Sequence, residues 1–204
     1  MKKYILVLLA LLFVFSGCVK KQVFMPLPFS FSESVELMTD GNGNINGQFI
    51  FPAQTFNTDI KAKLEELNEY VDINTVTIEG VSLEILDTNS PNSTIDLKLY
   101  VQSGSTQNPT ELLELDNVSL GQILNEPQIV ELNEDGVTVI KNVMTELVQN
   151  NTISNDLIAK ASGTASSTSS TVTFDIEVSI VVSVIVRQCQ EVFDMFGSSD
   201  EACD

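Results

Sequence analysis

Residues 171–187 have the sequence TVTFDIEVSIVVSVIVR, in which every second residue from Val172 to Val186 is apolar. The apolar positions are Val172, Phe174, Ile176, Val178, Ile180, Val182, Val184 and Val186. A period of two is typical of a β-strand with one buried face, because successive side chains point to opposite faces. At about 3.3 Å per residue, a strand of about 16 residues spans roughly 53 Å. This is longer than usual, so we expect the strand to bend or to cross between two sheets.

Shorter stretches upstream alternate in the same way. Phe29, Phe31, Val35 and Leu37 share one parity, and a further strand is expected at Gln48–Phe51. The turn sequence between them, residues 40–44, predicts that the two strands form a hairpin. Val76 and Ile78 alternate as well, whereas the next apolar residues, Val81, Leu83 and Ile85, have the opposite parity. This slip predicts a β-bulge at Gly80.

Further segments complete the expected secondary structure. Ile95–Val101 alternates as a regular strand, Gln128–Leu132 and Leu157–Thr164 are weaker strand candidates, and 111–127 is ambiguous. Two segments have apolar residues at helical spacing instead. The first contains Ile60, Leu64, Leu67 and Val71, with Asn57 or Thr58 as its N-cap; the second follows the cap Asn133 and contains Val139 or Ile140, Val143, Met144 and Leu147.

Together these patterns predict a mainly β fold: an antiparallel β-sandwich or a curled sheet with two short amphipathic helices covering an end. One parity of each strand is apolar, which is enough material for a single hydrophobic core. No internal repeat marks a second folded domain.

The N-terminus carries a targeting pattern. Lys2 and Lys3 precede the apolar run Tyr4–Val14, which is too short to span a bilayer and is followed by Phe15-Ser16-Gly17-Cys18. This arrangement resembles the lipobox of bacterial lipoproteins, although Phe15 stands where that family usually has leucine. The resemblance implies cleavage before Cys18 and acylation of its thiol. The alternative is an ordinary cleaved signal with a chance cysteine.

The expected organisation follows from this resemblance. Residues 1–17 would be the signal peptide, 18–27 the lipidated cysteine with a short tether, and 28–204 one β-rich domain with a C-terminal hook at 188–204. The acylated Cys18 would attach the protein to a membrane, because two or more acyl chains on one protein make the attachment stable. Val19 differs from the aspartate of an inner-membrane retention signal, so an outer-membrane location in the cell envelope is expected.

Charge and composition exclude several functions. The chain has 10 Lys and Arg against 28 Asp and Glu, a formal net charge of −18, and neither His nor Trp. Without His there is no Ser-His-Asp triad and no imidazole metal ligand. Nucleic-acid binding is disfavoured because it needs Lys and Arg to neutralise phosphates. Removal of residues 1–17 takes away Lys2 and Lys3 and no acid, so the mature chain would carry −20.

Cys189 and Cys203 form an even pair once Cys18 is assigned to lipid. In an oxidising compartment they are expected to form a disulfide. It would close a loop of about 15 residues, worth roughly 3 kcal/mol in the chain-entropy model. Two free thiols, or a redox or metal pair, are the alternatives. A redox or metal pair is disfavoured by the spacing of the two cysteines and by the acidic residues around them.

Two groups of residues are candidate sites. Asp40, Asn42 and Asn44 resemble the middle of an EF-hand calcium loop, but Met38 and Phe49 occupy positions that need oxygen ligands, which favours a hairpin turn. The adjacent acids, Glu65/Glu66, Glu114/Asp116 and Glu134/Asp135, are candidates for acid–base chemistry, although solvated charge is the usual explanation.

No catalytic residue, cofactor or firm metal site is therefore expected. The sequence favours a non-enzymatic, lipid-anchored cell-envelope protein with a structural or protein-binding role. Its partners would be the membrane and an envelope protein. The alternative is a carrier of an apolar ligand or lipid held between the sheet and the two helices.

Overall fold

The structure is a computed structural model that describes residues 17–67, 71–104, 108–166 and 171–194. Residues 17–21, 71–72, 129 and 189–194 are described by their backbone alone. The elements, in chain order, are β1 (Gly17–Met38), β2 (Asn44–Phe51), α2 (Ala53–Glu65), β3 (Val71–Thr88), β4 (Thr94–Ser103), β5 (Thr110–Ser119), β6 (Gln128–Ile129), α3 (Glu134–Asn150), β7 (Leu157–Ser166) and β8 (Thr173–Asp194).

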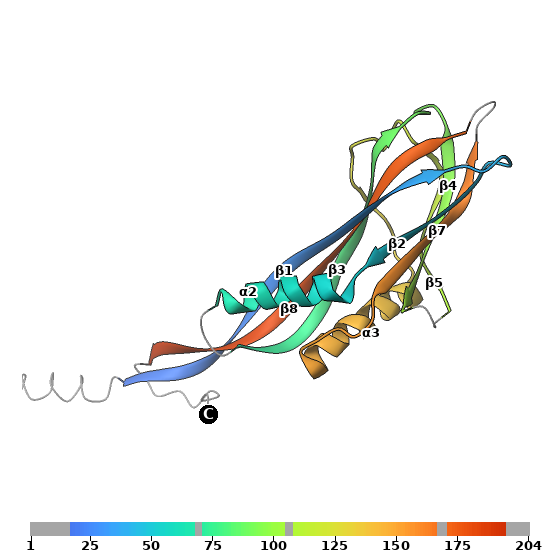
Figure 1. The fold of residues 1–204 in the computed structure, drawn as a ribbon. Helices are drawn as coiled ribbons and strands as arrows, with labels where there is room; N and C mark the ends of the chain where they lie inside the picture. Colours follow the sequence, from blue (N-terminus) through green and yellow to red (C-terminus); the bar gives the residue numbers. More distant parts are fainter. Residues whose placement is uncertain (1–16, 68–70, 105–107, 167–170, 195–204) are drawn as a thin grey trace, which may run out of the picture.

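The strands form two antiparallel sheets that are not closed into a barrel, as Figure 1 shows. Sheet A has the order β1-β8-β3-β6 and sheet B has the order β2-β7-β4-β5. The inward-facing apolar residues of both sheets form one core. The expected mainly β fold of the sandwich type is confirmed.

The alternating segment at 172–186 is the centre of sheet A. Strand β8 is 22 residues long, longer than expected, and pairs with β1 along its whole length and with β3 on its other side. Of the two expected alternatives, a bend or a crossing between sheets, the crossing is wrong because both neighbours stay with the strand, and β8 curves instead (Figure 1). Strand β3 follows its curvature through three register shifts, one of them between Ile78 and Gly80, which confirms the predicted bulge.

Strands β1 and β2 do not form the expected hairpin ladder. A single bridge joins Thr39 to Ile45, after which β1 pairs with β8 and β2 pairs with β7. Each strand has one buried face, and the faces of β1 and β2 meet across the core instead of lying side by side in one sheet. The turn at residues 40–44 therefore joins the two layers of the sandwich.

Helix α2 begins earlier than expected. It spans Ala53–Glu65, so the expected cap at Asn57 or Thr58 is wrong, and Val71 belongs to β3 instead of the helix. The reason is a long-range contact: the Asp156 carboxylate accepts a hydrogen bond from the Ala53 backbone N–H at 2.8 Å. Asn57 instead exchanges two hydrogen bonds with the backbone of Ile153.

Helix α3 agrees with its local sequence signals. The Asn133 side chain accepts a hydrogen bond from the Asp135 N–H at 3.0 Å and caps the helix as predicted. Its buried face contains Ile140, Val143, Met144 and Leu147. The helix packs on β3, β4 and β5, while α2 packs on β1 through Phe56, beside the part of sheet A that extends beyond sheet B (Figure 1).

The remaining strand predictions had mixed outcomes. The ambiguous segment 111–127 contains most of strand β5, and the expected strand at Leu157–Thr164 is β7. The strand expected at 128–132 is only two residues long.

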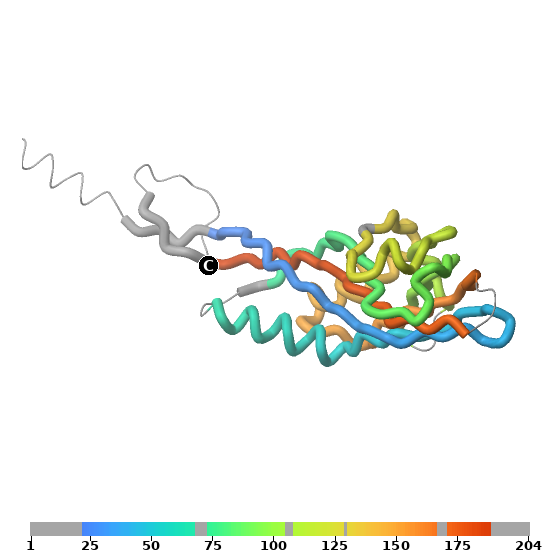
Figure 2. The backbone as a smooth tube through the Cα atoms, turned by 90° about the horizontal axis from the view of Figure 1, so that it is seen from above, coloured from blue at the N-terminus to red at the C-terminus, as the bar shows by residue number. Residues whose placement is uncertain are grey.

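Backbone pairing extends into the segments expected to be a tether and a hook. Residues 18–27 belong to β1 and pair with 184–193 of β8, so pairing begins before the expected domain start at residue 28. Figure 2 shows β1 and β8 running side by side out of the sandwich as a narrow projection. Residues 195–204 of the expected hook lie outside the described part of the chain.

Candidate functional site

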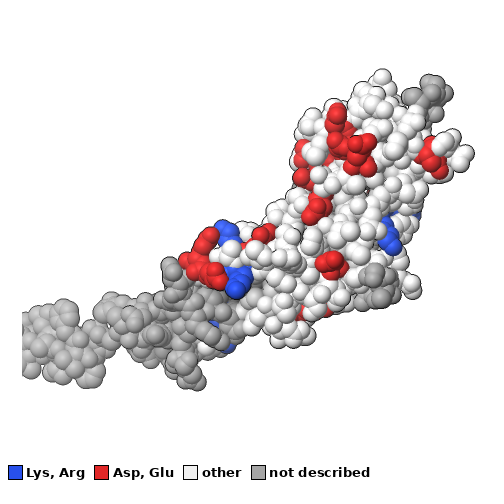
Figure 3. All heavy atoms as spheres, viewed as in Figure 1, with Lys and Arg blue, Asp and Glu red and all other residues white. Residues whose placement is uncertain are grey.

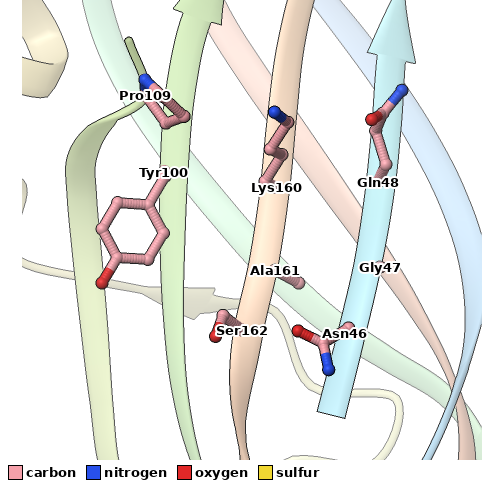
Figure 4. A pocket seen from close by; sticks show the side chains of 8 residues that line it. All are labelled: Asn46, Gly47, Gln48, Tyr100, Pro109, Lys160, Ala161 and Ser162. Carbon is pink, nitrogen blue, oxygen red and sulfur yellow. The ribbon is translucent and has the colours of Figure 1, made fainter.

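A groove of about 510 Å³ lies on the outer face of sheet B and is open to solvent. Its lining comes from β2, β7 and β4 and from the residue just before β5 (Figure 4), and its larger side chains are those of Asn46, Gln48, Tyr100, Pro109, Lys160 and Ser162. We refer to this surface as the sheet B groove. Its volume falls within the range of small-ligand pockets.

Strand register brings the side chains of the groove together. Lys160 of β7 lies opposite Gln48 of β2 on one side and opposite Tyr100 of β4 on the other. Ser162 lies opposite Asn46, two residues further along. The flanking residues of these strands, such as Phe49, point into the core. Because side chains alternate along a strand, burying that face presents the polar row to solvent.

The two lysines of this face have different surroundings. Lys98 Nζ lies 3.2 Å from Glu111 Oε2 and 3.1 Å from Glu114 Oε1. The hydrogen bond to Glu114, followed by that to Glu111, raises the pKa of Lys98. Among the described residues, by contrast, no carboxylate lies within ion-pair distance of Lys160. Lys160 is thus a cation of this face whose charge no carboxylate of the described residues offsets directly.

Carboxylates gather on the outer face of sheet A. Asp175 of β8 lies directly opposite Glu36 of β1 and Asp87 of β3, and Glu177 lies opposite Glu84. Figure 3 shows acidic side chains concentrated near the end of the molecule where these strands meet, with few basic ones on the same view. Like charges directly opposite in a sheet destabilise it.

Substitution of Asp175 by asparagine is therefore expected to stabilise the protein. It removes the central charge of the row formed with Glu36 and Asp87. The free energy of unfolding should rise by about 0.5–1 kcal/mol at low salt, measured by urea denaturation. The gain should shrink in 1 M NaCl because exposed charges are screened. Asp116→Asn on β5 is the control, and an equal gain there would contradict the explanation.

The turn containing the candidate calcium ligands is held by its own hydrogen bonds. Asp40 Oδ1 accepts hydrogen bonds from the backbone N–H groups of Asn42 (2.8 Å) and Asn44 (2.9 Å), and Oδ2 accepts one from Asn44 Nδ2 at 2.9 Å. The side-chain bond from Asn44 is the largest cause of the lowered pKa of Asp40, followed by the two backbone bonds. Gly43 has a φ of 82°. These features support the turn interpretation.

The three cysteines are placed only in part. The backbone of Cys18 lies opposite Phe193, and that of Cys189 lies opposite Gln22. Cys203 lies outside the described residues, so the disulfide between Cys189 and Cys203 stays a prediction.

Most of the adjacent acids considered for catalysis have structural partners. Glu65 and Glu66 form ion pairs with Lys61 (3.8 Å) and Lys63 (3.6 Å) on the surface of α2. Glu114 pairs with Lys98. Glu134 and Asp135 lie in the first turn of α3, where the helix dipole stabilises negative charge. Within the described ranges, no group of three or more Cys, Asp or Glu residues is placed to hold a metal ion.

The sheet B groove was not foreseen from the sequence. Apart from Pro109, its residues come from three strands, and only the register of β2, β7 and β4 places them side by side. A local signal existed in the polar parity of β4 and β7. Such a parity is the ordinary sign of a solvated sheet face, so it did not distinguish a groove.

Comparisons with known proteins add little to this description. No protein-family model matches the chain, and no curated protein matches it. Among solved structures, a chain of Desmodium yellow mottle tymovirus is 11% identical, with 85% of this chain and 93% of the viral chain covered and a TM-score of 0.30. A likeness at this level carries no argument. None of the helices in the described part of the chain is long and apolar enough to cross a membrane.

Proposed function

We propose that this chain is a non-enzymatic, lipid-anchored protein of the bacterial cell envelope with a structural or protein-binding role. The lipobox-like residues 15–18 support the anchor. The observation that carries the proposal is the position of Cys18 at the beginning of β1, which continues without interruption to Met38. Acyl chains on Cys18 would lie at one tip of a strand that extends for about 70 Å.

The positions of the sheet B groove and of the acidic row support an orientation in which Cys18 lies at the membrane and the sandwich lies away from it. The sheet B groove and the acidic row around Asp175 lie toward the end of the molecule away from Cys18, as Figure 1 shows for β4, β7 and β2. An anionic leaflet would repel the carboxylates, while the acyl chains hold the other tip. The paired strands β1 and β8 would then hold the sandwich at a distance from the lipid. Val19 supports an outer-membrane location.

The alternative function, transport of an apolar ligand between sheet and helices, receives less support. The pocket between β1, the end of β2 and α2 has a volume of about 20 Å³, which has room for a single water molecule. Phe56 and Ile60 of α2 and Ile140 of α3 are buried in the core that an apolar ligand would need to occupy. The large groove lies instead on the outer face of sheet B. The buried side chains of both described helices therefore favour a surface-binding role.

Metabolic labelling with a fatty-acid analogue tests the anchor. The wild-type chain and the matched variant Cys189→Ala are expected to incorporate the label, while Cys18→Ala is expected to incorporate none, because only the first thiol follows the lipobox-like residues. Labelled protein is detected after affinity purification and gel electrophoresis. Unchanged labelling of Cys18→Ala would overturn the proposed attachment.

A further inference from the structure

The sheet B groove has the hydrogen-bonding character of a site for a hydroxyl-rich ligand. The amides of Asn46 and Gln48 and the hydroxyls of Ser162 and Tyr100 can each donate and accept hydrogen bonds. Sugar hydroxyls also do both, so they can be paired without leaving a donor facing a donor. These groups are spread over three adjacent strands, which makes a broad, shallow surface and not a deep apolar slot.

One side of the groove provides a flat carbon surface. The ring of Tyr100 extends from β4 toward β5, below Pro109 in Figure 4, whereas Gln48 and Asn46 lie on the opposite side and Lys160 lies between them. A pyranose ring has a face of C–H groups that packs against an aromatic ring while its hydroxyls point outward to polar groups. An amphipathic ring of this kind matches the division of the groove into an aromatic and an amide side.

Lys160 adds a preference for negative charge. Lys160 is half-buried as a residue and, within the described part of the chain, has no carboxylate partner. The neighbouring Lys98 pairs with Glu111 and Glu114, so its positive charge partly offsets the negative charge of those two acids. The acidic row of Asp175 lies on sheet A, the other layer of the sandwich. Screening over about 8–10 Å weakens its influence on the groove.

We propose that the sheet B groove binds an acidic oligosaccharide, with a sugar ring stacked on Tyr100, hydroxyls bonded to the amides of Asn46 and Gln48, and a carboxylate paired with Lys160. The inference goes beyond the lipid anchor and the protein-binding role, and it depends on neither. The negative net charge of the whole chain disfavours an acidic ligand, and the local surroundings of Lys160 on the outer face of sheet B are the reason to expect one there. An envelope protein with this site would contact uronic-acid-containing glycans near the cell surface.

Titration of the full-length protein in detergent micelles with a galacturonic acid trimer tests the proposal. The matched control ligand is the methyl ester of the same trimer, which keeps the hydroxyls and rings but lacks the charge. Binding is followed by calorimetry or by protein NMR shifts. The acid is expected to bind more tightly than the ester, and its affinity should fall as salt is added.

Single substitutions test which side chains of the groove contact the oligosaccharide. Lys160→Ala should weaken binding of the acid about tenfold and leave binding of the ester unchanged, and Lys160→Arg should restore most of the loss. Tyr100→Ala should weaken both ligands about threefold to tenfold. Lys141→Ala removes an exposed lysine from α3 and should change neither. Absence of binding by the acid, or an equal effect of Lys160→Ala and Lys141→Ala, would overturn the site. Fatty-acid labelling at Cys18 is independent of either result.

Discussion

Replacement of Phe56 by alanine is expected to lower the free energy of unfolding by about 3–5 kcal/mol, the usual cost of deleting a buried aromatic ring. Phe56 is 1% exposed. Its ring meets the Phe31 ring edge-on at a centroid distance of 4.4 Å and stacks with the Phe51 ring at 6.5 Å. Because Phe31 belongs to sheet A and Phe51 to sheet B, the cavity would open where α2 joins both layers. Urea denaturation followed by circular dichroism measures the loss.

Two further variants make this result interpretable. Gln54→Ala changes an exposed residue of the same helix and should alter the free energy of unfolding by less than about 0.5 kcal/mol. Phe56→Leu retains part of the apolar volume, so it should lose less stability than Phe56→Ala and remain measurable if the alanine variant does not fold. Equal midpoints for Phe56→Ala and Gln54→Ala would show that the ring does not join the layers.

Replacement of Gly163 by alanine is expected to cost about 2–3 kcal/mol, although it adds only one methyl group. Gly163 lies in β7 between Ile45 of β2 and Leu97 of β4. A Cβ atom there would overlap the backbone carbonyl oxygen of Asp96 and approach the Leu97 Cα atom to 3.0 Å. Backbone atoms cannot move aside as a flexible side chain does, so relief would require distortion of the β4–β7 ladder.

Gly80→Ala provides the matched comparison. A Cβ atom at Gly80 would meet no atom within 4 Å, although this glycine also lies within a strand. Because alanine loses less conformational entropy than glycine on folding, this variant should be neutral or more stable by about 0.5–1 kcal/mol. Thermal unfolding of both variants checks the contrast. A similar loss of stability for the two would contradict the role of close backbone approach at Gly163.

Local sequence signals predicted those parts of the fold that depend on neighbouring residues. The alternation from Val172 to Val186 predicted a strand with one buried face, the change of parity at Gly80 predicted a bulge, and Asn133 predicted a helix start. In each example the physical cause acts within a few residues: side-chain alternation, an added backbone residue, and a capping hydrogen bond. Because the interacting residues are close in the sequence, these signals can be identified without knowledge of the tertiary structure.

Predictions that required distant partners failed or could not be made. The start of α2 depends on Asp156, which is 103 residues away from Ala53, so the local candidates Asn57 and Thr58 were misleading. The choice of partner for β2 was also wrong, because a turn of suitable sequence joins two layers as readily as two strands of one sheet. The groove around Lys160 had no local signal beyond ordinary polar alternation.

The sequence by itself determined the strand-rich class of the fold, the parity of the buried face in the clearly alternating strands, the acidic charge and the resemblance of residues 15–18 to a lipobox. The tertiary structure alone decided that β8 stays between β1 and β3, that β1 and β2 belong to different sheets, and that Tyr100, Lys160 and Gln48 lie in one row. The physical reason is that alternation specifies which face of a strand is buried but not which strand lies beside it. That choice depends on how all the buried faces fill one core together.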